Sequence, residues 1–224
     1  MATEVDICNL SLAHLGDDAT IASLSPPEGS AQAEQAARFY PIARDTLLDM
    51  HSWDFATRRA SMALTTNANA QWKYAYASPN DMMNAVSIIS PTADNDYATK
   101  MGPSEGQSST YSPTVSAGHY VPQQYAVEID SLGNYLIYTN QEAAVLRYQA
   151  KIENTSRFSP LFTMTLSWHL ASMLAGPVVK GDAGAAESKR CTQVMSGYLQ
   201  KAISSDVLNR DIKVSHIVPW TAGR

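Results

Sequence analysis

Apolar side chains recur at helical spacing in the first fifty residues. Thr3 followed three residues later by Asp6 resembles a capping box, and it begins a predicted helix over residues 4–15. That helix has four apolar side chains on one face: Val5, Cys8, Leu12 and Leu15. A second, longer helical pattern starts at residues 25–28 or at Ser30 and continues to residue 50. Pro41 lies inside it, so we expect a kink near residue 39 or two helices that meet there.

Alternation of apolar and polar residues replaces this pattern in the middle of the chain. Aromatic residues alternate over residues 72–76, and residues 85–89 have the composition of a strand. Three further strands are predicted at 125–129, 135–138 and 145–148, with Gly133-Asn134 as turn chemistry between the first two. An antiparallel meander is their simplest assembly. The polar residues 91–124 are typical of a long loop or of a segment ordered by a partner.

Helical spacing returns near residue 159. Ser159-Pro160 supplies an N-cap and a first-turn proline for a helix that ends near residues 176–177. A final helix is expected over residues 184–208. The last residues, 209–224, are apolar yet extended, because Pro219 and Gly223 exclude a helix there. An apolar extended tail predicts that a partner surface covers it.

These patterns predict an α+β protein, in which a helical bundle formed by the N- and C-terminal helices carries a β-rich domain inserted in the middle. Residues 1–69 and 153–208 would form the two parts of the helical domain, residues 70–152 the inserted β-rich domain with its loop 91–124, and residues 209–224 the extended C-terminal tail. The 224 residues, 45% of them hydrophobic, suffice for one sizeable core or for a core and a smaller satellite domain.

Charge and composition narrow the function classes. Sixteen Lys and Arg against 21 Asp and Glu give a net charge of −5, without blocks of like charge, so bulk electrostatics do not attract nucleic acid. The longest apolar stretch, residues 161–174, is interrupted by polar residues and is too short for a membrane span. The acidic N-terminus lacks the pattern of a secretory signal, so we expect synthesis and retention in a cytoplasm.

Known catalytic and metal-binding motifs are matched only weakly. Residues 102–106 fit GxSxG, but the flanking strand and helix that a nucleophile elbow needs are not predicted. Residues 94–96 resemble the start of a calcium loop without its Gly and closing Glu. Asn154 is read as a cap, and the Arg58-Arg59 pair as solvent-facing or ion-paired rather than as a phosphate contact. The two cysteines, Cys8 and Cys191, have no disulfide or zinc spacing.

The histidines show no paired spacing either: His14, His51, His119, His169 and His216. A metal site would need two or more of them at a defined separation, as in HExxH. The sequence therefore predicts no catalytic residue, no cofactor and no metal, and we expect a protein that is not an enzyme.

One stretch has a specific spacing of polar and aromatic residues. It is formed by Tyr40, Arg44, Asp45, His51, Trp53, Phe55 and Arg58. With its flanks from Pro27 to Arg59, this stretch resembles the tail tubular protein A family of short-tailed bacteriophages. The resemblance continues through residues 72–79, 145–148, 158–162 and 171–175, and covers most of the chain. Residues 91–124 have no counterpart and are interpreted as an insertion.

The resemblance implies a structural head-to-tail adaptor, or gatekeeper, of a podovirus virion. In this family the helical bundle docks under the portal and the β-domain meets the tail nozzle, a tubular protein B-like component. Twelve copies would form a ring around the DNA exit channel, through which DNA passes during ejection without sequence-specific binding. No membrane partner is expected. Such a protein is made in the bacterial host cytoplasm and ends at the head–tail junction of the virion.

The C-terminal tail is the expected portal-binding segment, because its apolar residues would otherwise be exposed. The residues concerned are Ile212, Val214, Ile217, Val218, Trp220 and Arg224. Two alternatives stay open on the sequence: another connector or tail ring protein, and a tail-associated cell-wall hydrolase, whose carboxylate pair nothing in the sequence marks.

Overall fold

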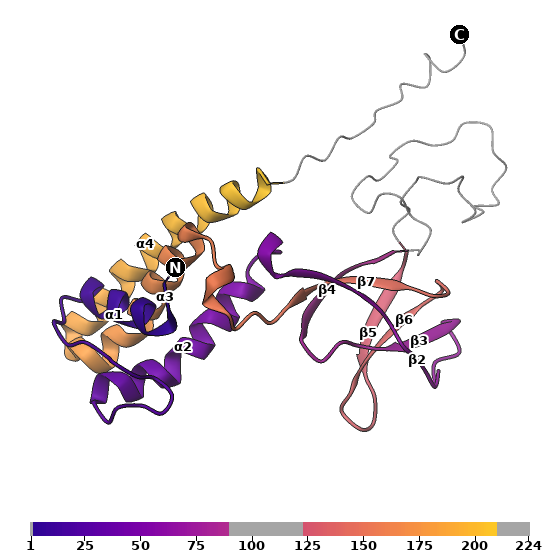
Figure 1. Ribbon diagram of the computed structural model, residues 1–224, viewed down its shortest axis with the longest axis horizontal. Coiled ribbons are helices and arrows are strands. Elements are labelled where there is room, and N and C mark those ends of the chain that lie inside the picture. Colours follow the sequence, from indigo (N-terminus) through magenta and orange to yellow (C-terminus); the bar gives the residue numbers. More distant parts are fainter. Residues whose placement is uncertain (1, 90–122, 210–224) are drawn as a thin grey trace, which may run out of the picture. The chain divides into compact units, whose positions relative to one another are not determined.

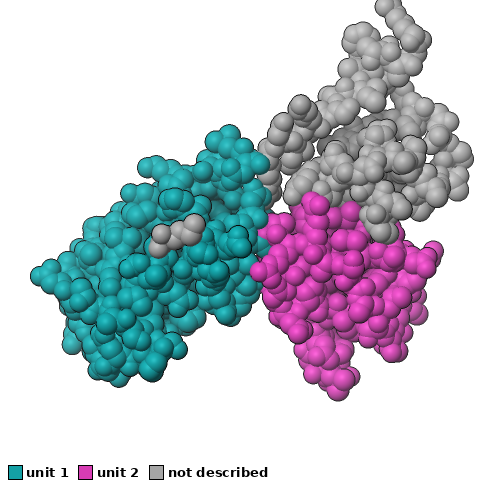
Figure 2. All heavy atoms as spheres, viewed as in Figure 1, with its two compact units in different colours: residues 1–56, 151–210 teal, residues 57–150, 211–224 magenta. Residues whose placement is uncertain are grey.

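The computed structural model describes residues 2–89 and 123–209 of an α+β protein (Figure 1). The chain divides into two compact units, coloured separately in Figure 2. Residues 1–56 and 151–210 form the first, which contains the described helices and is called the helical unit below. Of the described residues, 57–89 and 123–150 form the second, which contains the described strands and is called the sheet unit.

Helix starts in the helical unit are fixed by side-chain caps. Helix α1, Glu4–His14, begins with a complete capping box between Thr3 and Asp6. Ser30 caps α2, Ala31–Asp49, and Ser159 caps α3, Pro160–Val179, which has Pro at its first position. A single residue, Lys180, separates α3 from α4, Gly181–Val207. Short 3-10 turns at Asp54–Ala56 and Thr155–Arg157 complete the unit.

Helix α3 is the centre of the helical unit. It packs against α1, α2 and α4, and its buried side chains include Phe162, Leu166, Leu170 and Leu174. The first turn of α4 lies very close to α3, because a Cβ built on Gly184 would be 2.8 Å from the Ala175 carbonyl oxygen. Only glycine permits this approach without a shift of one helix.

The sheet unit holds two antiparallel sheets. In the three-stranded sheet, β7 (Val145–Ala150) lies between β1 (Thr57–Ser61) and β4 (Met82–Ile89). The four-stranded sheet has the order β2-β3-β6-β5, with bounds Leu64–Thr65, Tyr74–Ala77, Tyr135–Thr139 and Tyr125–Ile129 respectively. The fully buried side chains here include Tyr76, Ile88, Ile137 and Leu146.

Several expectations about single elements need correction. Helix α2 continues through Pro41 for 19 residues, so two separate helices are wrong there. Helix α3 likewise continues past residues 176–177 to Val179. The meander is wrong for its third strand: β5 and β6 pair, but β6 then pairs with β3, and β7 belongs to the other sheet. Strands also begin at Thr57 rather than near residue 70, since the five-residue strand β1 has no clear alternation.

Candidate functional site

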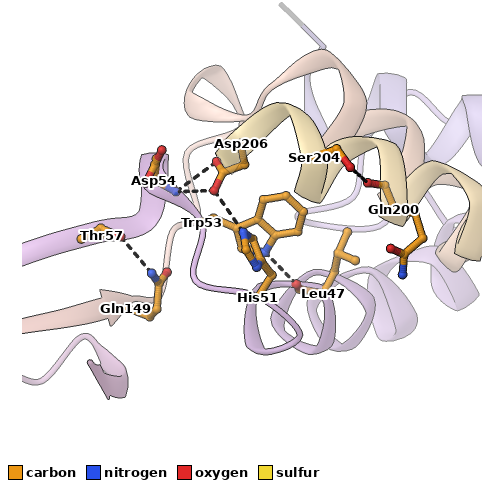
Figure 3. Close-up of polar contacts among 9 residues, drawn as sticks. All are labelled: Leu47, His51, Trp53, Asp54, Thr57, Gln149, Gln200, Ser204 and Asp206. Atoms are coloured by element: carbon orange, nitrogen blue, oxygen red, sulfur yellow. Dashed lines mark hydrogen bonds and ion pairs between the residues drawn. The ribbon is translucent and has the colours of Figure 1, made fainter. Parts of the chain in front are cut away.

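The residues that carry the family resemblance gather mostly around the C-terminal end of α2. Trp53 is almost fully buried there, and its indole Nε1 donates a hydrogen bond to the Leu47 carbonyl oxygen at 2.9 Å (Figure 3). The indole lies edge-on to Phe162 of α3 at 5.0 Å between ring centroids, and Phe55 contacts both rings. Trp53 and Phe55 therefore connect the end of α2 to α3 through aromatic packing.

A buried carboxylate from the far end of the chain joins this cluster. Asp206, in the last turn of α4, lies 3.1 Å from Nε2 of His51, as Figure 3 shows. Its two carboxylate oxygens also accept the Asp54 backbone N–H at 3.2 and 3.3 Å. The sequence resemblance indicated His51 but gave no signal for Asp206, which lies 155 residues away. The contact ties the C-terminal end of α4 to the segment that follows α2.

A second polar network surrounds Arg44, the one cation of the described residues that is almost completely buried. Its Nε donates to Asp45 at 2.8 Å, and its guanidinium lies 3.7 Å from Glu153. Lys151 completes the network, 3.0 Å from Asp45 and 3.9 Å from Glu153. Two acids thus compensate two cations, and the network holds residues 151–153 against α2. Sequence analysis indicated Arg44 and Asp45 but missed Lys151 and Glu153, which no motif marks.

The remaining two resemblance residues have structural surroundings as well. Tyr40 is buried in α2, its hydroxyl has no hydrogen-bond partner among the described residues, and burial raises its pKa far above the ordinary 10.0. Arg58 is part of β1 in the sheet unit and pairs with Asp81, which also accepts a hydrogen bond from the Tyr148 hydroxyl at 2.9 Å. Arg58 is therefore ion-paired, in line with the solvent or ion-pair reading of this arginine.

No group of three or more His, Cys, Asp or Glu side chains within residues 2–89 and 123–209 has the arrangement of a metal site. His14 stacks on Trp168 at 3.6 Å and lies 3.0 Å from the Ser167 hydroxyl, so it is a packing residue. Asn154 caps the 3-10 turn Thr155–Arg157 that precedes α3, whereas α3 itself is capped by Ser159. No helix in the described part of the chain is long and apolar enough to cross a membrane.

Several expected site residues lie outside the described residues. These are the portal-binding residues of the tail, the GxSxG match at 102–106, the acidic residues 94–96, and two histidines, His119 and His216. Most of the loop at 91–124 lies outside as well.

Comparisons with known proteins give no further identification. No protein-family model matches the chain, and no curated protein matches it. The arrangement around α2 consists of hydrogen bonds, ion pairs and aromatic contacts that stabilise the helical unit.

Proposed function

We propose that this protein is a structural head-to-tail adaptor of a short-tailed bacteriophage, forming a ring that joins the portal to the tail nozzle and surrounds the DNA exit channel. The observation that carries the proposal is the spacing of seven residues between Tyr40 and Arg58, which resembles the tail tubular protein A family. Six of the seven pack into the helical unit, where they join α2 to α3, α4 and residues 151–153.

The fold supports an adaptor for a physical reason. An adaptor must present different surfaces to two partners, and this chain has two compact units with separate cores. In the proposal, the helical bundle docks under the portal and the inserted β-domain contacts the nozzle. The apolar tail after residue 209 anchors the chain to the portal. A closed ring of twelve copies further needs a heterologous interface, in which one face of each subunit meets a different face of the next.

Charge is consistent with passage of DNA. The subunit has a net charge of −5, and a strongly basic channel wall would bind phosphates and slow DNA ejection. The proposed ring therefore surrounds DNA without holding it, in the virion at the head–tail junction.

Native mass spectrometry of the purified chain, alone and mixed with its cognate portal protein, tests the proposal. We expect a small species alone and a ring-sized complex with portal. Deletion of residues 211–224 should abolish portal binding, while circular dichroism stays that of the full chain. A chain that ignores the portal but binds tail tube components would favour another connector ring instead. Clearing of a bacterial cell-wall suspension by the protein would favour the hydrolase.

A further inference from the structure

The hairpin formed by β5 and β6 ends in an exposed apolar tip. Its connecting residues, 130–134, project beyond the neighbouring strands in Figure 1, and the sheet unit has a narrow extension in Figure 2. Three large apolar side chains stand at this tip with more than half of their surface accessible: Leu132 at 84%, Ile129 at 59% and Tyr135 at 53%. We call Ile129, Leu132 and Tyr135 the hairpin tip.

Strand register explains why these side chains are not buried. Ile129 pairs with Tyr135, and Val127 pairs with Ile137, so all four side chains lie on one face of the sheet. Ile137 is fully buried on that face, whereas Val127, Ile129 and Tyr135 are exposed. The apolar face of the hairpin therefore extends further than the core that covers its base.

The loop at the tip is held in one conformation. One carboxylate oxygen of Asp130 accepts the backbone N–H groups of Leu132 and Asn134, each at 2.8 Å, and the other accepts the Asn134 side-chain amide. The Asp130 backbone N–H donates to the Asn134 carbonyl at 3.0 Å, and Gly133 supplies the positive φ of 86° that the turn requires. Leu132 is thus presented by a fixed loop, which lowers the entropy cost of binding.

The hairpin also has one sign of charge. Residues 125–139 contain Glu128 and Asp130 but no Lys, Arg or His. A complementary surface has an apolar pocket for Leu132 and cationic side chains around it. An anionic lipid surface would repel these carboxylates, so the chemistry favours a protein.

We propose that the hairpin tip docks into an apolar pocket rimmed by Lys or Arg side chains on a partner protein, with Leu132 as the central anchor. The identity of that partner as the tail nozzle component rests on the proposed adaptor function; the geometry of the tip does not. The inference deepens that function by assigning the contact to one preformed hairpin of the sheet unit.

Binding of the full-length chain to purified cognate nozzle protein tests the inference, measured by biolayer interferometry both with and without portal. Leu132→Ser should weaken binding about tenfold or more, because a central anchor is lost. Glu128→Gln should weaken it less and reduce its dependence on salt. Leu64→Ser is the matched control, since Leu64 is an exposed apolar residue at the opposite edge of the same sheet, and it should bind as the wild type.

Unchanged nozzle binding by Leu132→Ser would overturn the inference, as would a wild-type chain that binds no nozzle protein. Loss of portal-templated assembly in Leu132→Ser, with nozzle binding intact, would assign the tip to a second copy of this chain and also overturn it. Co-sedimentation of the wild type with phosphatidylglycerol vesicles, abolished by the same variant, would do so too. Tip-dependent nozzle binding by a chain that never assembles on portal would support the inference and count against the proposed ring.

Discussion

Removal of the Asp206 carboxylate is the perturbation that most directly tests how the helical unit is held together. The carboxylate is buried in the last turn of α4 and bonds both the Asp54 backbone N–H and the His51 imidazole. Asp206→Ala leaves both groups without this acceptor. Position 206 lies in a helix, where alanine is well accommodated. The measured change in unfolding free energy therefore reports mainly the loss of these two contacts.

The magnitude follows from the two groups that lose this acceptor. The Asp54 backbone N–H is partly buried, and the loss of its Asp206 acceptor costs about 1–3 kcal/mol. The His51 side chain is 18% exposed, so water replaces part of its lost contact and we expect only about 0.5–1 kcal/mol there. Asp206→Ala should therefore destabilise the helical unit by about 1.5–4 kcal/mol. Asp206→Asn retains one acceptor oxygen and should lose about half of that.

Urea unfolding with tryptophan fluorescence measures the effect. Trp53 and Trp168 belong to the helical unit, so Trp72→Phe and Trp220→Phe in the background make the signal specific to it. Asp182→Ala is the matched control, because Asp182 is exposed in the first turn of the same helix and its loss should cost less than about 1 kcal/mol. If Asp206→Ala unfolds at the same urea concentration as Asp182→Ala, the reasoning about the buried carboxylate is refuted.

Three further changes test local features of the same unit. Lys180 has φ 62° and ψ 162°, a backbone conformation that costs a residue with a side chain about 1–3 kcal/mol. Lys180→Gly removes this strain but adds about 0.4–1 kcal/mol of conformational entropy to the unfolded state. We therefore expect a higher thermal midpoint, and a lower midpoint would contradict this. Gly184→Ala should destabilise, because its Cβ would meet the Ala175 carbonyl oxygen at 2.8 Å, and Gly197→Ala, with open space around it, is its control in the same helix. Burial lowers the pKa of His169 in the folded state below its ordinary 6.5. The stability that the neutral imidazole contributes is therefore fully present above pH 6.5 and is lost as the pH falls through the folded-state pKa. Between pH 7.5 and 5, the unfolding free energy should fall less in His169→Leu than in the wild type; an equal fall contradicts this.

Local signals predicted the helix starts well. Thr3, Ser30 and Ser159 each cap a helix where the sequence placed one, because capping depends on residues only three positions apart. Prolines were over-interpreted as breaks. Pro41 removes one backbone donor, but Tyr40, Ala43 and Leu47 are buried on the same helix, and this packing stabilises a continuous α2 in place of one hydrogen bond.

Long-range pairings were beyond the reach of local patterns. The strand at residues 145–150 has the alternation of its neighbours, yet it pairs with β1 and β4, almost 90 and 60 residues earlier. Asp206 looks like any acidic residue near a helix end until the fold brings it to His51 and Asp54. The family resemblance indicated His51 in the first polar network and Arg44 with Asp45 in the second, and only the fold shows the others.

The insertion of the sheet unit into the helical unit makes the two polar networks structurally necessary. A chain that leaves the helical unit at residue 56 and returns at residue 151 must fix both of these segments, since closing a long connection costs conformational entropy. Asp206 fixes the first through Asp54, and Arg44 with Asp45 fixes the second through Lys151 and Glu153.

The charged residues of the second network differ in how much their loss would cost. Lys151 and Glu153 are exposed at their outer ends, where ion pairs contribute little. Arg44 is buried, so removal of its acidic partners would leave a desolvated cation and a much larger cost. The return segment is therefore held to α2 by the Arg44–Glu153 and Lys151–Asp45 pairs, and the neighbouring Asp45 compensates the buried Arg44.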